Sequence, residues 1–151
     1  MIIVSVAATD PVLRQLIAEQ QAELAGLPGF TGFPLHDGIT YVAAYSGGHP
    51  VGCGGVQPLG DGVGEVKRMY VRPAFRGQGR SRLILAAIEE YAVQRGYHTL
   101  RLETGSHLAP ALALYRGAGY AHIPPFGDYV GNDTSVCFEK VLLAAPSLDR
   151  P

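Results

Sequence analysis

One segment, residues 64–81, constrains the fold of this chain more than any other. Residues 65–71 alternate in polarity and are rich in β-favouring side chains, which predicts a strand. Pro73 ends that strand because proline has no N–H group to give to a ladder. The run Arg76-Gly77-Gln78-Gly79-Arg80-Ser81 follows and leads into a helix. The segment therefore predicts a strand, a tight glycine turn and the start of a helix.

The residues after this turn complete a strand–helix–strand unit. Apolar residues recur at helical spacing from Leu83 to Ala92, and Arg95-Gly96 supplies a cation and a left-handed cap at the helix end. Residues 99–104 form a second predicted strand. In such a unit the strands run parallel with a right-handed crossover. The glycine turn then lies at the carboxyl end of the first strand, where such sheets bind ligands.

The glycine turn has the features of an anion site. Gly77 and Gly79 let the backbone turn tightly, so that successive N–H groups converge at the positive end of the helix dipole. Arg76 and Arg80 add positive charge that suits a diphosphate. The spacing matches neither a Walker loop nor the dinucleotide fingerprint. From these six residues alone, a solvated turn without a ligand stays an open alternative.

The remaining elements follow from the same patterns of period and turn chemistry. Asp10-Pro11 predicts the start of a helix that continues to Gly26. Residues 26–38 are too rich in glycine and proline for either period and predict a loop. Gly52, Gly54 and Gly55 predict a bulge or a close backbone approach. Further strands are expected at residues 2–6, 39–45, 51–59 and 135–141.

Two motifs resemble those of the GCN5-related N-acetyltransferases, the GNAT family. Residues 71–81 resemble its acyl-CoA motif, Gln/Arg-x-x-Gly-x-Gly/Ala, with Ser81 in place of the last residue. Residues 111–120 resemble its helix that ends in Leu-Tyr and then Gly-Phe/Tyr, although Leu108 stands where many members carry Asn. The resemblance implies an α/β fold. It has a mixed, mostly antiparallel twisted sheet of about six to seven strands, a central parallel βαβ unit and helices on both faces.

The resemblance also implies acetyl-CoA, the acetylated form of coenzyme A, as the acyl donor. The main chain of residues 69–71 would pair with the pantetheine arm like an added strand, and the amides of residues 78–81 would hold the diphosphate. The predicted acyl-CoA contacts are Met69, Tyr70, Val71, Arg76, Gly77, Gln78, Gly79, Arg80, Ser81, Ala111, Leu114 and Tyr115.

Two residues are candidates for moving protons. A protonated amine has no free lone pair, and Glu65 resembles the family's general base, acting directly or through a water. Its alternative is a surface glutamate on a strand. Tyr115 resembles the general acid that protonates the leaving thiolate, and its alternative is a packing tyrosine with a hydrogen-bonded hydroxyl. The resemblance implies direct attack in a ternary complex.

The substrate cleft is expected near two loops and one strand end. Phe33 and His36 in the first loop could line the cleft or fold back on the core. Glu103 could face the cleft, although a surface ion pair with Arg101 is the favoured interpretation. The predicted substrate contacts are Phe33, His36, Glu103, Phe126 and Tyr129.

Length, charge and cysteine content exclude several classes of protein. The 151 residues fit one domain at 1–145, with a frayed end at 146–151. A net charge of −1 argues against nucleic-acid binding. No apolar run approaches the ~20 residues needed to cross a bilayer, and no signal peptide is recognised, so a cytoplasmic location is expected. Cys53 and Cys137 are expected to be buried thiols, and the histidine and cysteine spacing predicts no metal site.

We therefore expect a small bacterial N-acetyltransferase that moves an acetyl group from acetyl-CoA to a primary amine of a small molecule. An amine of a protein or peptide is the nearest alternative. A catalytically silent acyl-CoA sensor is the other, and the motif departures at Ser81 and Leu108 motivate it. Dimers are common in the family that the chain resembles, which allows a homodimer.

Overall fold

A computed structural model describes residues 1–27 and 38–142. Phe33 and His36 lie outside the described residues, as do most of the loop predicted at 26–38 and the end predicted to fray at 146–151. The elements are β1 Ile2–Val6, α1 Pro11–Ala25, β2 Thr40–Ser46, β3 His49–Gly60, β4 Val63–Val71, η1 Pro73–Phe75, α2 Arg80–Gln94, β5 Thr99–Gly105, α3 Ala109–Gly117, β6 Ala121–Ile123, η2 Gly127–Tyr129 and β7 Ser135–Val141.

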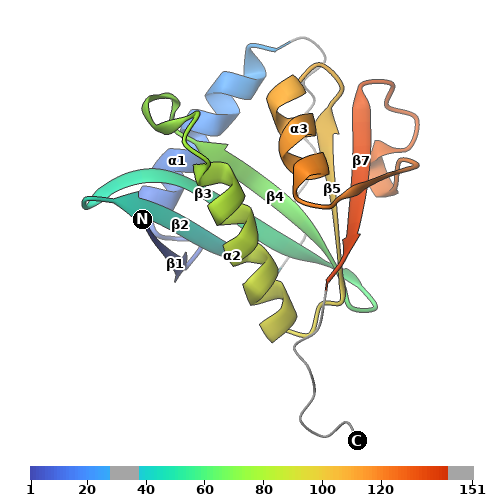
Figure 1. The fold of residues 1–151 in the computed structure, drawn as a ribbon, viewed down its shortest axis with the longest axis horizontal. Coiled ribbons are helices and arrows are strands. Elements are labelled where there is room, and N and C mark those ends of the chain that lie inside the picture. Colours follow the sequence, from blue (N-terminus) through green and yellow to red (C-terminus); the bar gives the residue numbers. More distant parts are fainter. Residues whose placement is uncertain (28–37, 143–151) are drawn as a thin grey trace, which may run out of the picture.

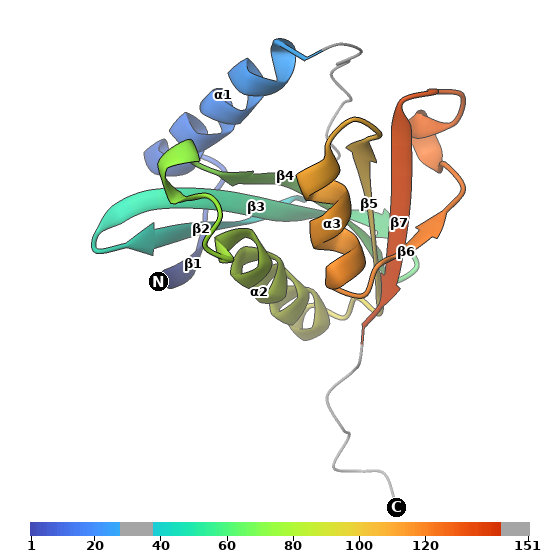
Figure 2. The same cartoon turned by 45° about the horizontal axis from the view of Figure 1, so that its top comes forward.

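The strands form one sheet in the order β1-β2-β3-β4-β5-β7-β6. Neighbours within it are antiparallel except β4 and β5, which are parallel. Figure 1 shows α2 and α3 in front of the sheet and α1 behind it, and Figure 2 shows α1 on the side of the sheet opposite to α2. The mixed sheet, its central βαβ unit and the helices on both faces are therefore confirmed. No helix in the described part of the chain is long and apolar enough to span a membrane.

Local signals explain where the helices begin and end. The side chain of Asp10 accepts a hydrogen bond from the Leu13 amide at 3.0 Å and caps α1, with proline in the first turn. In α2, the helix of the βαβ unit, Gly79 caps the start and has a left-handed backbone conformation. Gly96, with φ of 87°, follows the end of the same helix. These boundaries agree with the predicted ones.

The two faces of the sheet have separate apolar cores. On one face Ile84, Leu85 and Ile88 of α2 pack with the buried residues of β4, β5 and β7. On the other, Leu13 and Leu16 of α1 form a smaller cluster whose sheet residues are Tyr41, Cys53 and Tyr70. Cys53 and Cys137 are buried and unpaired, as expected.

β4 and β5 stay together for only part of their length. Their register runs from Val63 opposite Thr99 to Glu65 opposite Arg101, and the strands then diverge. Figure 1 shows this divergence beside α3. Side chains from both strands and from α3 therefore meet where the main chains separate.

A bulge interrupts β4 just beyond this point. Lys67 lies opposite Gly55 and Tyr70 opposite Cys53, so that the β4 side holds one extra residue. Arg68 is the extra residue. Its φ of 60° is a backbone conformation that residues other than glycine rarely adopt. The bulge changes which residues of β4 point to which face.

The glycines of β3 bring the sheet close to its neighbours, as predicted. A Cβ atom at Gly52 would lie 2.3 Å from the Tyr70 carbonyl oxygen, and one at Gly54 would lie 2.6 Å from Ile88 Cδ1. The first contact is with the backbone of the adjacent strand, which cannot move without opening the ladder. Glycine is therefore required at these positions for packing against β4 and α2.

We expect Gly52→Ala to lower the free energy of unfolding by about 1–3 kcal/mol, because the added methyl group forces β3 away from β4. For a chain of this length that is a fall in Tm of roughly 2–4 °C per kcal/mol. Gly26→Ala is the control. Gly26 has φ of −80°, and its Cβ would lie 3.6 Å from the Glu23 carbonyl oxygen. It should be neutral or stabilise the fold by about 0.4–1 kcal/mol. Equal unfolding curves for both variants would contradict this account.

Candidate active site

A cavity of about 300 Å³ lies between α1, the end of β4, the glycine turn and α3. Of the residues predicted to contact acyl-CoA, all except Gln78 line it. Its wall also contains residues that were not predicted: Gln20, Glu23, Leu24, Phe75 and Pro110. Two motifs that are distant in the sequence, at residues 71–81 and 111–120, thus form one continuous surface.

The glycine turn presents a row of unpaired amides to one end of this cavity. Gly77 and Gly79 both have φ of 75°. Within the described residues, none of the amides of residues 77–82 donates a hydrogen bond to another group. The first turn of α2 contains no acidic residue that could satisfy them. The turn thus retains free donors at the positive end of a helix, as an anion site requires.

The two arginines of the turn lie at its rim. The Arg80 guanidinium donates to Gln78 Oε1 at 2.9 Å and lies 5.4 Å from the ring centroid of Phe75. The Arg76 guanidinium donates to the Val71 carbonyl at 2.7 Å and pairs with Glu23 at 2.8 Å. Both are exposed enough to exchange these partners for a phosphate group.

Helix α1 is attached to β4 by polar side chains on one of its faces. Gln20 Nε2 donates to the Met69 carbonyl at 2.7 Å, and Glu19 accepts from Arg72 Nη2 at 2.8 Å. The hydrogen bond and the charge of Arg72 lower the pKa of Glu19, which therefore stays ionised at neutral pH. Sequence reasoning did not assign these residues to the site. The sequence did contain a signal for them. Glu19 and Gln20 are adjacent polar residues on a helix whose apolar residues are enough to form its contact with the core.

Tyr115 reaches the cavity from α3. Its ring packs against Tyr120 and Phe138, with centroids 6.0 and 6.3 Å away. Burial raises the pKa of its hydroxyl, and the negative charge of Glu103 raises it further. No other described residue forms a hydrogen bond with this hydroxyl. The ring therefore packs in the core, as the alternative of a packing tyrosine expected. The hydroxyl, however, has no hydrogen-bond partner among the described residues; it is protonated and available to a ligand.

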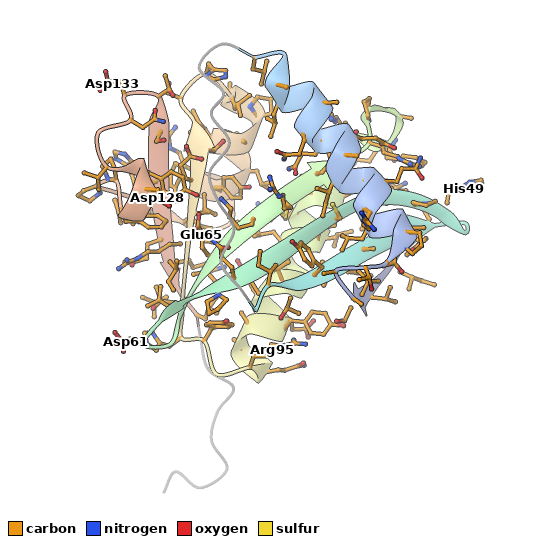
Figure 3. All side chains as sticks on the ribbon, turned by 180° about the vertical axis from the view of Figure 1, so that it is seen from behind. His49, Asp61, Glu65, Arg95, Asp128 and Asp133 are labelled. Atoms are coloured by element: carbon orange, nitrogen blue, oxygen red, sulfur yellow. The ribbon has the colours of Figure 1, made fainter. Side chains whose placement is uncertain are left out.

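Glu65 is buried at the point where β4 and β5 diverge. It is only 3% exposed, so the alternative of a surface glutamate is wrong. Its carboxylate accepts hydrogen bonds from Gln57 Nε2, at 3.0 Å, and from the Tyr129 hydroxyl, and lies 3.5 Å from Lys67 Nζ. Figure 3 shows Glu65 on the face of the sheet that α1 covers. Glu65 does not line the cavity, which lies on the side of Tyr115.

Predicted substrate residues gather around Glu65. Lys67 Nζ donates to Tyr129 Oη at 2.8 Å, and the Tyr129 ring meets Phe126 edge to face at 5.3 Å. Burial and the hydrogen bond to Glu65 raise the pKa of the Tyr129 hydroxyl. It therefore stays protonated and donates to the Glu65 carboxylate.

Glu103 lies on the neighbouring strand and faces the same group of residues. It accepts a hydrogen bond from Ser135 Oγ at 2.6 Å, and burial raises the pKa of its carboxyl group. The favoured interpretation, a surface pair with Arg101, is wrong. Arg101 Nε instead pairs with Glu139 of β7 at 2.8 Å. Glu103 is directed toward Ser135, with Lys67 and Glu65 close enough to act on its carboxyl group.

Within the described residues no group of histidine, cysteine and acidic side chains is arranged to hold a metal ion. The residues around the proton-transfer candidates Glu65 and Tyr115 include carboxylates, tyrosines and a glutamine. Tyr115 approaches the divergence of β4 and β5 from the face of α2 and α3, and Glu65 approaches it from the face of α1.

Comparison with known proteins agrees with this geometry. A family model described as the acetyltransferase (GNAT) family matches residues 11–120. The IAA acetyltransferase of Azospirillum brasilense is 42% identical over 105 residues, which span 69% of each chain. A Klebsiella pneumoniae structure assigned as an acyl-CoA N-acyltransferase is 39% identical, with a TM-score of 0.83 over 94% of this chain and 97% of that one.

A second solved structure shares the fold at lower identity. It is a GNAT acetyltransferase from Elizabethkingia anophelis with acetyl-CoA bound, 17% identical, with a TM-score of 0.71 over 93% of this chain and 97% of that one. The family model covers most of the chain, and the relative from Azospirillum brasilense is similar over more than two thirds of it. The chain therefore belongs to the GNAT family of acetyltransferases.

Proposed function

We propose that this N-acetyltransferase moves an acetyl group from acetyl-CoA to a primary amine of a small molecule by direct attack in a ternary complex. One observation carries the proposal. A buried carboxylate, Glu65, and a protonated hydroxyl, Tyr115, flank the divergence of β4 and β5 from opposite faces. A base and an acid on opposite sides of one opening suit a reaction in which one partner loses a proton and the other gains one.

The residues of the cavity fit acyl-CoA. The free amides of residues 77–82, with Arg76 and Arg80 beside them, would hold the diphosphate. The main chain of residues 69–71 borders the cavity and would hold the pantetheine arm. Ala111 and Leu114 supply an apolar wall. Ser81 also lines the cavity, and its small side chain preserves the close approach that the motif requires.

Bound acetyl-CoA supplies a thioester whose C–S bond breaks as the amine nitrogen takes the acyl group, so the amine must lose a proton and the thiolate must gain one. We assign Tyr115 as the donor of that proton, which is supported by its protonated hydroxyl and its position in the cavity wall. We assign Glu65 as the group that takes the proton of the amine, directly or through a water. Its hydrogen bonds from Gln57 and Tyr129 fix the carboxylate in one orientation.

A small-molecule acceptor is favoured because the acceptor side is confined. Glu65 is 3% exposed and Tyr129 4%, so little of the proposed base is accessible to a bulky acceptor. A flexible peptide terminus is the second candidate. We place the reaction in a bacterial cytoplasm. The relative from Azospirillum brasilense is bacterial, and the unpaired cysteines suit a reducing compartment.

We expect acetyl-CoA to stabilise the protein and Gly79→Ala to remove most of that effect. At ~100 times its Kd a ligand stabilises by about 2.7 kcal/mol, a shift in Tm of several degrees. Alanine at φ of 75° distorts the amides of the turn. The control is Gly131→Ala, because Gly131 has φ of 84° outside the cavity. It should cost similar stability and leave the acetyl-CoA shift intact. No shift in the wild type would remove the cofactor assignment.

We expect free-thiol release when amines are screened with acetyl-CoA, and Tyr115→Phe to slow that release at least about tenfold with little change in acetyl-CoA affinity. The screen should contain small primary amines and peptides with free N-termini, each followed by thiol detection. Release with peptides alone would select the second candidate acceptor. A thermal shift without release from any amine would indicate a silent acyl-CoA sensor. An unchanged rate in Tyr115→Phe across the pH range would exclude the general-acid role.

We expect Glu65→Gln to lower kcat/KM at least about tenfold at pH 7, with the loss shrinking as pH rises toward the pKa of the amine. Without a base, only amine that is already neutral can attack, and a lysine-like amine with a pKa of ~10.4 is almost wholly protonated at pH 7. Glu139→Gln is the matched control, because Glu139 forms the surface pair with Arg101. A loss that is equal at every pH would indicate a structural role for Glu65.

A further inference from the structure

We propose that Arg68 binds a carboxylate group on the acceptor, so that the acceptor is an amine of the amino-acid type. This inference rests on the proposed function and names the substrate class of the same site. It follows from where the bulge of β4 places Arg68 and from the state of its guanidinium group. Neither the acyl-CoA motif nor the acid–base pair explains this residue.

The bulge turns Arg68 to the face that carries Glu65. Without an extra residue, Lys67 and Arg68 would point to opposite faces. Lys67 faces Glu65 and Tyr129. Met69 is the next residue that points to the opposite face, the side of α2. A Cβ atom built on Gly54 would lie 2.8 Å from Met69 Sδ and 2.6 Å from Ile88 Cδ1 of α2. Arg68 is therefore placed on the same face as Lys67.

The neighbours of Arg68 confirm this placement. Burial raises the pKa of the Tyr41 hydroxyl and of the Cys53 thiol, to about 12 for Cys53, and the positive charge of Arg68 opposes both shifts. Tyr41 and Cys53 belong to the apolar cluster beneath α1. The guanidinium thus lies over the face of the sheet to which Glu65 also belongs.

Arg68 has no partner in the described part of the chain. Its Nε is buried without a hydrogen bond, and no described residue forms an ion pair with it. The other basic residues near the opening are all engaged. Lys67 pairs with Glu65, Arg72 with Glu19 and Arg101 with Glu139. Among the described basic residues next to the β4–β5 divergence, Arg68 is the one left for a ligand.

Arg68 has two unfavourable features, a buried nitrogen without a partner and a strained backbone, and their presence at one position indicates a ligand. The Nε atom of a guanidinium group buried without a hydrogen-bond partner is unfavourable. A non-glycine residue with φ of 60° adds backbone strain. Glycine at the bulge would remove both costs. A bound anion would offset the first of them, because charge-assisted hydrogen bonds are stronger than neutral ones.

The chemistry of the site favours a carboxylate among the anions. The Nε and one terminal nitrogen of a guanidinium form a planar fork that matches two carboxylate oxygens. Glu65 and Glu103 place further negative charge on the same face, so a doubly charged phosphate would be repelled more strongly than a carboxylate. An acceptor with both an amine, presented to Glu65, and a carboxylate, held by Arg68, satisfies both groups.

The test compares amino acids with their own amides. A panel of free amino acids, each beside its carboxamide, is assayed with acetyl-CoA by thiol release, using wild type, Arg68→Gln, Arg68→Lys and the control Arg14→Gln. Arg14 is an exposed residue on α1, so its substitution removes one cation without touching the opening. The amide has the less basic amine, so intrinsic reactivity at neutral pH favours the amide. A preference for the acid must then come from the enzyme.

We expect the wild type and Arg14→Gln to prefer the acid by at least about tenfold in kcat/KM, Arg68→Gln to lose that preference, and Arg68→Lys to keep part of it. The acetyl-CoA thermal shift should be the same in all four proteins, which shows that they are folded. Equal use of acid and amide by the wild type would overturn the proposal, and so would a preference that survives in Arg68→Gln. Thiol release only from amines without a carboxylate would also overturn it while leaving the transferase function intact.

Discussion

The parallel pairing between β4 and β5 is the constraint on which the site depends. It lasts from Val63 to Glu65 on one strand and from Thr99 to Arg101 on the other. A longer ladder would bring the two main chains together and close the opening between the two faces of the sheet. A shorter ladder would leave too few hydrogen bonds to join the two parallel strands of the βαβ unit. The length of this ladder places Glu65, its last member, beside the opening.

Tyr115 and Glu65, the proposed acid and base, come from different layers of the fold. Tyr115 belongs to α3, which packs with α2 on one face, while Glu65 and Tyr129 meet on the other. A sheet normally separates its two faces completely. Here the β4–β5 ladder ends at Glu65 and Arg101, and under the proposed mechanism groups from both faces would act at this point. Tyr115 is held by the apolar cluster under α2, and Glu65 by its hydrogen bonds from Gln57 and Tyr129.

Much of this arrangement could be predicted from the sequence because its signals are local. The period of α2, the glycines of the turn and the Asp10-Pro11 cap each act within a few residues, and the predicted boundaries agree closely with the structure. The acyl-CoA wall was predicted for a different reason, since two motifs resembled those of one family. β6 was not predicted, because three residues at Ala121–Ile123 are too few to show alternation.

What could not be predicted depends on contacts between distant residues. The burial of Glu65 depends on Gln57 and Tyr129, one on β3 and one on a turn late in the chain. The partner of Arg101 is decided by the register of β5 against β7, which places Glu139 directly opposite it. The bulge at Arg68 appears only when β3 and β4 are aligned. The hydrophobic period of a single segment does not show which distant residues will contact one another.

Helix α1 has a consequence for how the two ligands influence each other. Leu24 and Glu23 of α1 line the cavity, and Gln20 holds the Met69 carbonyl beside the bulge that carries Arg68. The same helix covers the face on which Glu65 lies. The two ligands therefore share one wall. If acetyl-CoA and the acceptor bind as proposed, a displacement of α1 by either ligand would alter the other's surroundings. The two binding events would then be thermodynamically linked, and by reciprocity to the same extent in each direction.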